Sequence, residues 1–528
     1  MTGSFDLIVR GGAVVDGTGA EPVAGDVGVV GNRITAVGDL SGAVAGEYLD
    51  ATGSLVFPGF IDAHSHADAL LAEPRVQEAC LSQGVTTVIL GQDGLSFAPS
   101  DPFAIAYVER YFGAINGPAP DAFRGGISVA DLLDSYDRRG AVNAAYLVPA
   151  ATVRAQVVGL APRQATADEL RRMVAQVEQA VADGAVGLST GLDYVPGQFA
   201  GAEELAAICR PVGEAGGTYV SHLRGYAGDR LADALAEAGH IASLSGAQGH
   251  VSHLHGQASL IEETLAALRD EQGVTLSFDS YPYLRGSTLV SMIMLPSDLQ
   301  DGGIDATVDR LADPAVRDRL RHKWFPHVLG SRRSITLSFV DHPEFRWAEG
   351  MTLAQATEQW GQGDLTDFVC TILTACGLVV GCVADNGSDR TEEDVRHLLR
   401  HPAHMASSDA VFLGTRPHPR GWGTFARLLG RHVRELGDWT WGQAALHLSG
   451  NAARRFGLAG RGLVAPGQIA DLVVLDPERV TDRATYDDPT QTAVGVSHVV
   501  VSGQVALREG KLSEAHCGRA LRAGDGSR

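Results

Sequence analysis

The sequence predicts an α/β protein: a closed (β/α)₈ TIM-like barrel, a small β-sandwich domain formed by both chain termini, and an insertion late in the barrel. Three observations support this fold class. Eight apolar strand-like segments lie in the middle of the chain, helical patterns separate most of them, and both ends carry short alternating strands. The 528 residues suffice for a barrel of roughly 250 residues and an accessory domain.

The two ends of the chain share one pattern. Residues 1–54 contain DLIVRGGAVVDGTG and DVGVVGNRITAVGDL, and residues 459–528 contain GLVAPGQIADLVVLD and GVSHVVVSGQVALREGK. Alternating apolar positions with Gly and Asp between them are typical of β-hairpins. Because neither end alone can bury its apolar face, we expect the two ends to form one domain together.

The first part of the barrel is predicted over residues 55–283. Its clearest helix begins with a capping box of Thr166 and Glu169, carries one apolar stripe and ends at Gly184. The strand AVGLST follows, and TYVSHL, QGHVSHL and VTLSFDSY recur at roughly 30-residue spacing, as in parallel βαβ units. An opening strand near residue 60, GVTTVIL, NAAYLV and AHMASSD bring the set to eight.

Residues 284–403 break this rhythm. They contain the strand-like segments ITLSFV and LVVGCVA, and we interpret them as an insertion that covers the barrel mouth, together with barrel helices. Residues 404–458 are then expected to complete the barrel.

The composition excludes several classes of partner. A formal charge of -21 argues against a surface for nucleic acid or an anionic membrane, since both need clustered basic residues. The N-terminus lacks a signal-peptide pattern, and no apolar run reaches the ~18 residues of a membrane span, so we expect a cytoplasmic protein. The expected partner is a small molecule; the oligomeric state stays open, with a homodimer as one option.

Two histidines, His64 and His66, close the segment FPGFIDAHSHAD. Side chains two apart on a strand point to the same side, so both imidazoles can bind one metal ion. The alternative is that they are two polar residues at a strand end. The flanking acids Asp62 and Asp68 favour a metal site.

Histidine and aspartate residues also end other predicted strands. In barrel enzymes the active site lies at this end of the strands. Any one of them alone would more often be a hydrogen-bonded core residue, but together they indicate one metal site. The set is His64, His66, Asp93, His222, His253 and Asp409.

Several motifs carry a resemblance to a known family: PGFIDAHSHAD, GVTTVILGQDG, GLSTGLDYVPG, YVSHLRG, HVSHL, SSDA and HPRGWGTFARLLG. With RGLVAPGQIADLVVLDP near the end, nearly the whole chain resembles the amidohydrolase superfamily, and within it the N-acyl-D-amino-acid deacylase (D-aminoacylase) group. The resemblance implies a metal-dependent hydrolase that cleaves a non-peptide amide bond of a small molecule.

The resemblance also implies roles for individual residues. His64, His66 and Asp409 would hold one metal, and His222 and His253 a second, with one or two Zn²⁺ per subunit. Asp409 would act as catalytic general base, taking a proton from the attacking water and passing it to the leaving amine. The chemistry is sound, because bound Zn²⁺ lowers the pKa of water to about 7.

The metal motifs depart from the family at one position. A carboxylated lysine cannot bridge two metals here, because the only lysines, Lys323 and Lys511, lie outside the predicted barrel strands. The deacylase group has a bridging cysteine in a GxCG context, where this chain has GQDG. We therefore predict that Asp93 is a metal ligand; the alternative is a turn residue ahead of Gly94.

The substrate motifs depart further. The family's HHK lysine is replaced by His255, the acid of its HxRxE motif by Tyr226, and its GH pair by Pro149 and Ala150. Guanidinium groups bind carboxylates bidentately, whereas histidine is only partly charged at neutral pH. The predicted substrate-binding residues are Tyr194, Arg224, His255, Tyr281 and Arg420.

Three functions stay open at this point. The first is hydrolysis of N-acyl-D-amino acids. The second keeps the metal chemistry but acts on a cyclic amide or imide, or on an acyl amine without a free carboxylate. The third is a catalytically silent binding or assembly protein, which surviving metal-ligand positions disfavour.

Overall fold

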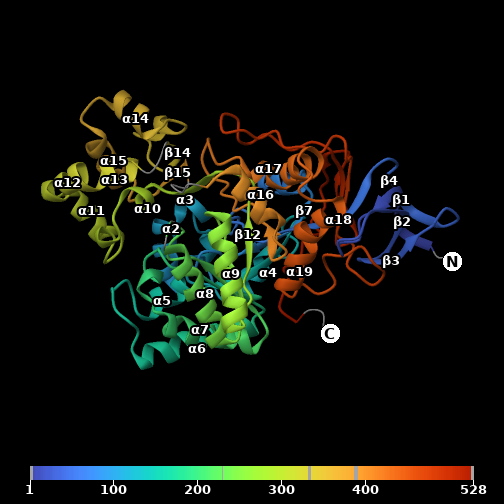
Figure 1. The fold of residues 1–528 in the computed structure, drawn as a ribbon, viewed down its shortest axis with the longest axis horizontal. Helices are drawn as coiled ribbons and strands as arrows, with labels where there is room; N and C mark the ends of the chain where they lie inside the picture. The colour runs from blue at the N-terminus through green and yellow to red at the C-terminus, as the bar shows by residue number, and fades with distance from the viewer. Residues whose placement is uncertain (1–3, 227, 229, 331–333, 386–389, 525–528) are drawn as a thin grey trace.

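The computed structural model describes residues 4–226, 228, 230–330, 334–385 and 390–524, and its centre is an eight-stranded parallel barrel (Figure 1). The sheet order is β16-β12-β11-β10-β9-β8-β7-β6. Between the edge strands, Ala63 N donates to Ala406 O at 3.2 Å. The strands are β6 (Phe60–Asp62), β7 (Val85–Leu90), β8 (Asn143–Pro149), β9 (Gly187–Gly191), β10 (Thr218–His222), β11 (Gln248–Val251), β12 (Ser277–Ser280) and β16 (His404–Ala406). The predicted barrel is confirmed.

Helices surround the strands. The clearest predicted one is α6 (Ala167–Ala182), whose capping box of Thr166 and Glu169 is present and whose inner face buries Met173 and Val177. The others around the barrel are α1 (Pro74–Leu81), α2 (Pro102–Tyr111), α3 (Gly113–Asn116), α4 (Val129–Tyr136), α5 (Ala150–Val157), α7 (Ala202–Glu214), α8 (Arg230–Ser245), α9 (Ala258–Gln272), α16 (Glu392–Arg400), α17 (Arg420–Arg427), α18 (Trp441–Ala445) and α19 (Asn451–Arg455).

Both ends of the described chain meet in one nine-stranded sheet beside the barrel (Figure 1). Its central β5 (Leu55–Pro58) pairs parallel with β1 (Ser4–Val14) and antiparallel with β17 (Leu472–Leu475), which joins the two ends. The remaining strands are β2 (Val23–Val30), β3 (Arg33–Gly38), β4 (Val44–Asp50), β18 (Val496–Val501), β19 (Gln504–Arg508) and β20 (Lys511–Leu512).

The apolar run near residue 60 is divided between the two sheets. Residues 55–58 belong to the terminal sheet, and the barrel strand starts only at Phe60. Gly59 lies at the crossing, where a Cβ would come within 2.2 Å of Thr86 Oγ1. Only glycine allows the two sheets to approach this closely.

Residues after β12 form a separate lobe at the upper left of Figure 1. Its three-stranded antiparallel sheet has β15 (Val380–Asp385) between β13 (Arg285–Leu289) and β14 (Ile335–Val340). Its helices are α10 (Val290–Met294), α11 (Ile304–Ala312), α12 (Pro314–Arg319), α13 (Phe325–Gly330), α14 (Leu353–Trp360) and α15 (Leu365–Ala375). The limits of the predicted segments stay predictions.

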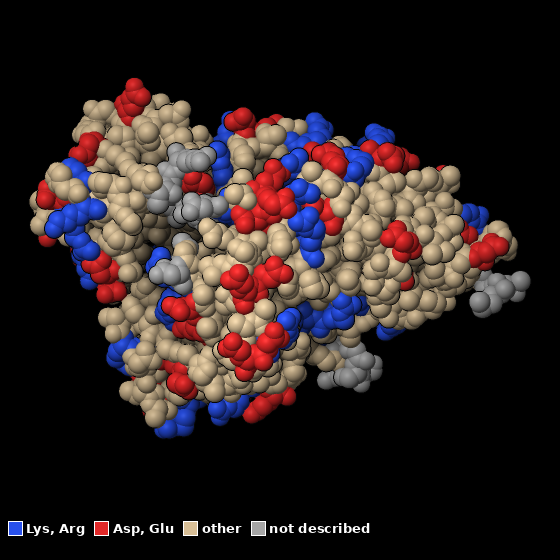
Figure 2. Space-filling model, in the orientation of Figure 1, with Lys and Arg blue, Asp and Glu red and all other residues tan. Residues whose placement is uncertain are grey.

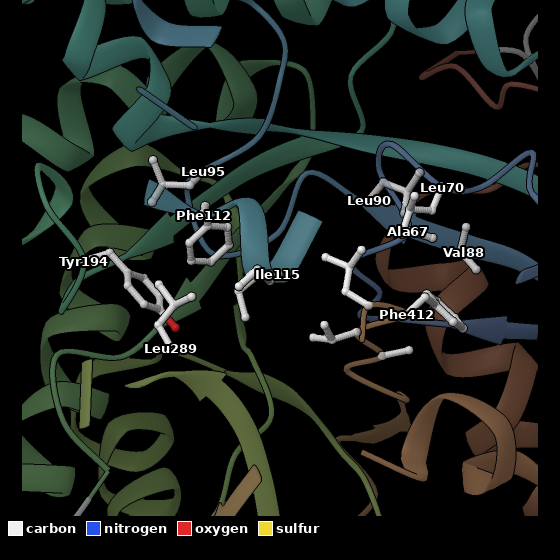
Figure 3. Close-up of a cluster of buried hydrophobic side chains, with 14 of the residues drawn as sticks. Ala67, Leu70, Val88, Leu90, Leu95, Phe112, Ile115, Tyr194, Leu289 and Phe412 are labelled. Carbon is white, nitrogen blue, oxygen red and sulfur yellow. The ribbon is translucent and has the colours of Figure 1, made fainter. Parts of the chain in front are cut away.

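Apolar packing ties this lobe to the loops at the barrel mouth. Figure 3 shows Leu289 of β13 beside Tyr194, Phe112 and Ile115, all of which are buried. The rings of Phe112 and Tyr194 meet edge to face at 5.1 Å. The mouth is therefore framed by a packed core. Within the described part of the chain, no helix has both the length and the apolar character needed to cross a bilayer.

Candidate metal centre and active site

The two histidines of the first strand converge on one point. Strand β6 ends at Asp62, but Ser65 makes a parallel bridge with Ala410, so the extended backbone continues past the strand. His64 Nε2 and His66 Nε2 lie 3.3 Å apart, and both rings are buried. The predicted same-side geometry is therefore present.

Asp93 lies in the middle of the four histidines. Its Oδ1 is 3.6 Å from Nε2 of both His64 and His253, and its Oδ2 is 3.6 Å from His66 Nε2 and 3.4 Å from His222 Nδ1. The residue follows β7 with a φ of 56°, a left-handed conformation that Asp tolerates better than most residues. One carboxylate thus faces two pairs of imidazoles.

Asp409 is held against the first strand by hydrogen bonds. Its backbone N donates to His64 O at 2.8 Å. The preceding Ser408 donates from its backbone N to Asp62 Oδ1 at 2.8 Å and from its hydroxyl to Asp62 Oδ2. Burial raises the pKa of Asp62 to about 7 even though these donors lower it. This buried carboxyl group fixes the relative position of the loops after β6 and β16.

The Asp409 side chain is divided between two sets of partners. Its Oδ1 lies 3.4 Å from His66 Nε2 and 3.7 Å from His64 Nε2, and its Oδ2 lies 2.7 Å from Arg420 Nη1. Burial raises the pKa of Asp409, but Arg420 and the neighbouring histidines outweigh burial and lower it to about 2. Asp409 is therefore an ionised acceptor at neutral pH.

Two groups of side chains have ligand atoms within 4.8 Å of one another, and all their members are buried. They are His64, His66 and Asp409, and His64, Asp93 and His253. The sixth predicted ligand, His222, packs its ring against His253 at 4.7 Å between centroids. The structure therefore brings all six predicted metal residues together.

Two acidic residues that the sequence did not single out support the histidines. Asp279 on β12 accepts from His253 N at 2.9 Å, and its Oδ2 lies 3.0 Å from His250 Nε2 and 3.8 Å from His64 Nδ1. Asp193 Oδ1 lies 3.0 Å from His222 Nε2. The sequence feature that could have identified Asp279 is a single acidic residue inside the strand-like segment VTLSFDSY.

The electrostatics of the site favour a cation. Burial lowers the pKa of His64, but Asp93, Asp279 and Asp409 outweigh burial and raise it to about 9. Burial likewise lowers the pKa of His222, and Asp193 and Asp93 raise it well above its usual value. Such clustered buried carboxylates need positive charge nearby, which a divalent ion supplies.

The donor set fits a transition metal. Two imidazole nitrogens that bind one tetrahedral Zn²⁺ at about 2.0–2.1 Å must lie about 3.4 Å apart, and His64 Nε2 and His66 Nε2 are 3.3 Å apart. His222 Nδ1 and Asp93 Oδ1 are buried without an aligned hydrogen bond in the described part of the chain, while His222 Nε2 lies beside Asp193. Buried polar atoms normally have a partner, and a bound ion would provide one.

Comparison with known proteins agrees with this geometry. Residues 47–507 match the model of the amidohydrolase family. The chain belongs to the amidohydrolase family. It is 35% identical to D-aminoacylase of Alcaligenes xylosoxydans xylosoxydans, over 98% of this chain and 97% of the relative.

Two solved structures are similar to this amidohydrolase over nearly its whole length. A D-aminoacylase with a binuclear metal center has a TM-score of 0.82 and 33% identity, covering 98% of this chain and all of its own. The N-acyl-D-glutamate deacylase of Bordetella bronchiseptica, bound to zinc and a phosphonate inhibitor, has the same TM-score and coverage at 32% identity. The predicted resemblance to the D-aminoacylase group is confirmed.

The amidohydrolase's mouth opens into a cavity of about 580 Å³, within the range of small-ligand sites. Residues of β13, α10 and β15 line it together with the barrel loops. His64 lies behind this wall, in contact with His66. The cavity is lined by all the other predicted site residues: His66, Asp93, Tyr194, His222, Arg224, His253, His255, Tyr281, Asp409 and Arg420.

Two of the predicted substrate-binding residues are already engaged. The Arg224 guanidinium pairs with Glu237 at 2.9 Å and donates to the carbonyls of Leu192, Gln198 and Ala200. His255 stacks on Tyr226 with ring centroids 4.5 Å apart. Burial, and then the charge of Arg390, lower the pKa of His255 well below its usual value, so it is uncharged at neutral pH.

Proposed function

We propose that this amidohydrolase uses bound Zn²⁺ and water to hydrolyse the amide bond of a small N-acyl amino acid, most simply an N-acyl-D-amino acid, as its D-aminoacylase relatives are named for doing. One observation carries the proposal: four histidines and two carboxylates from different strands converge at the carboxyl end of the barrel, at the bottom of a substrate-sized cavity. The cytoplasmic location and the homodimer stay sequence-based predictions.

The residues that would hold the metal follow from the contacts. His64, His66 and Asp409 form one set, and His222 and His253 the second, with Asp93 between them. Each Asp93 oxygen lies 3.4–3.6 Å from one imidazole of each set, so this carboxylate lies between the two proposed metal positions. When bound, Zn²⁺ lowers the pKa of a water molecule to about 7 and polarises a carbonyl group.

Asp409 is the proposed general base. Its Oδ2 is held by Arg420, so its Oδ1 is oriented toward the two histidines of the first strand. An ionised carboxylate at this position can take a proton from the attacking water and donate it to the leaving amine. Such general acid–base catalysis typically contributes about 10²–10⁴-fold in rate.

The substrate would lie between the barrel loops and the lobe above them. Tyr281 lies with its ring 4.7 Å from the Arg420 guanidinium, at the wall of the cavity. Arg420 is the one predicted substrate residue that could contact both a substrate anion and Asp409. We propose that Tyr281, Arg420 and Tyr194 position the substrate and that Arg224 mainly shapes the wall.

A second candidate keeps the chemistry and changes the substrate to a cyclic amide, an imide or an acyl amine without a free carboxylate. The state of two residues favours it: Arg224 is neutralised by Glu237, and His255 is uncharged. The guanidinium groups that remain in the described lining are those of Arg230 and Arg420. A neutral substrate would need neither of them as a carboxylate partner.

Turnover assays with the purified holoenzyme separate these candidates. The panel contains N-acetyl-D-amino acids, their L enantiomers, and cyclic amides, with metal content measured on the same sample. Faster hydrolysis of the D-amino acid derivatives supports the first candidate, and faster ring opening supports the second. A protein with no bound metal and no turnover on any compound would instead indicate a binding protein.

A further inference from the structure

A second cavity, of about 790 Å³, lies at the opposite end of the barrel from the proposed active site. It is lined by Asn32 and Arg33 at the β2–β3 turn, by Ser502 and Gln504 at the β18–β19 turn, and by residues 516–522. That last segment is bound to the start of β8, because Ala144 N donates to the Arg519 carbonyl and the Ala144 carbonyl accepts from Leu521 N. The cavity therefore joins the terminal β domain to the barrel.

The lining of this cavity is strongly basic although the chain carries a net charge of -21. Among the described residues, its lining contains no carboxylate. On the face shown in Figure 2, basic side chains gather between the barrel and the β domain, near the C-terminus marked in Figure 1. The basic lining residues are Arg33, Arg138, Arg461, His516, Arg519 and Arg522.

Three of these arginines have acidic partners just outside the lining. Asp471 pairs with Arg461 and Asp137 with Arg519, each at 3.0 Å, and Asp134 pairs with Arg522 at 2.6 Å. The other two do not. Within the described ranges, neither Arg33 nor Arg138 has a carboxylate within 4.0 Å, and Arg33 donates only to the Gly467 carbonyl. The cavity therefore has an excess of positive charge.

Neutral donors complete the lining. Ser502 Oγ is buried without a hydrogen-bond partner among the residues that the structure describes, and Asn32 and Gln504 also belong to the lining. Arg138 and Ser502 both have left-handed backbones, with φ of 55° and 50°. Such conformations cost free energy and often occur at binding sites. No Phe, Tyr or Trp side chain belongs to the described lining.

We propose that this cavity binds a short oligophosphate chain. Guanidinium groups bind phosphate oxygens bidentately, and hydroxyl and amide groups supply the remaining donors. The volume is in the range of small-ligand sites. A bound chain would connect Arg33 of the β domain with Arg138 and the C-terminal segment of the barrel, so it would stabilise the folded protein by mass action without touching the active site.

The test is titration of the holoenzyme with tripolyphosphate, by calorimetry and by thermal melting, with excess Mg²⁺ present so that the ligand does not remove the catalytic metal. We expect saturable one-site binding and a Tm that rises with ligand concentration. The double variant Arg33→Gln/Arg138→Gln should bind at least about tenfold more weakly, since each lost charge-assisted hydrogen bond is worth that much. Amide hydrolysis by this variant should be unchanged.

A matched double variant, Arg171→Gln/Arg269→Gln, removes two exposed arginines elsewhere on the barrel helices and should bind as the wild type does. If the first double variant does not fold, its two single variants replace it. Equal affinity for ATP supports recognition of the phosphates alone. The proposal is overturned if there is no binding, if the double variant binds as tightly as the control, if ATP binds but tripolyphosphate does not, or if sulfate at equal ionic strength stabilises as well.

Discussion

Arg420 Nη1 lies 2.7 Å from Asp409 Oδ2, and their side chains are only 1% and 9% exposed. This ion pair orients the carboxylate of Asp409, the proposed general base. The guanidinium holds one carboxylate oxygen, and the other oxygen faces His64 and His66. The same contact favours the ionised carboxylate, because it places a fixed positive charge beside it.

Replacing Arg420 with Gln should shift the acidic limb of the pH–rate profile. The pKa of Asp409 is lowered to about 2 in part by Arg420. Loss of the cation makes the ionised form less favourable, so the pKa rises, by about one unit. The acidic limb of kcat/KM should move to higher pH by a similar amount. If the acidic limb does not move and only the plateau of kcat/KM falls, Arg420 does not lower the pKa of Asp409.

Asp93→Ala should lower both metal content and activity. All four imidazoles that face the Asp93 carboxylate lie within 3.6 Å of it, so its loss removes a carboxylate that lies between the two proposed metal positions. Atomic absorption on the purified variant gives the stoichiometry. Asp93→Cys, which restores the residue type of the deacylase group, should recover metal content. Unchanged metal content and activity in the alanine variant would refute the bridge.

Asp279→Asn should weaken metal binding without removing a direct ligand. The carboxylate accepts from His253 N and lies between the rings of His250 and His64. Loss of a carboxylate that orients a metal-binding histidine typically costs about 10–100-fold in metal affinity. Competition with a chelator measures this. Asp270→Asn, an exposed acid on α9, is the control. Equal affinity in both variants would make Asp279 a purely structural residue.

His255→Lys should improve the use of substrates that carry a free carboxylate. An ammonium group would restore the charge that the neutral His255 lacks, and a charge-assisted hydrogen bond is worth about 1.5–3 kcal/mol, or roughly tenfold or more in KM. The comparison is KM for an N-acetyl-D-amino acid against KM for its amide. If KM falls for both compounds, or for neither, position 255 does not contact the carboxylate.

The sequence predicted the barrel well because its strands are apolar, regularly spaced and bounded by helix signals. It did not predict that residues 55–58 belong to the terminal sheet. The run from Leu55 to Phe60 contains no polar side chain and is interrupted only by Pro58 and Gly59, and the change of sheet depends on the close contact of Gly59 with Thr86. Nor did it predict β13, whose pairing with β15 joins residues about a hundred positions apart. Local patterns do not carry such long-range pairing.

Part of the candidate site could likewise be predicted from the sequence, and part could not. Strand-end histidines could be found because parallel strands of a barrel bring their carboxyl ends to one mouth. Asp279 was missed because an acid inside a strand looks like a break in the pattern until its histidine partners are known. The engagement of Arg224 by Glu237, thirteen residues later on α8, likewise depends on the folded contact.

The central claim is that the clustered histidines and carboxylates hold a metal on which amide hydrolysis depends. The most direct measurement is hydrolysis of an N-acetyl-D-amino acid and of a cyclic amide by the same enzyme sample before chelation, after chelation, and after adding Zn²⁺ back. We expect turnover of at least one substrate to disappear with the metal and to return with Zn²⁺. Full activity in protein shown to be free of metal would contradict the account.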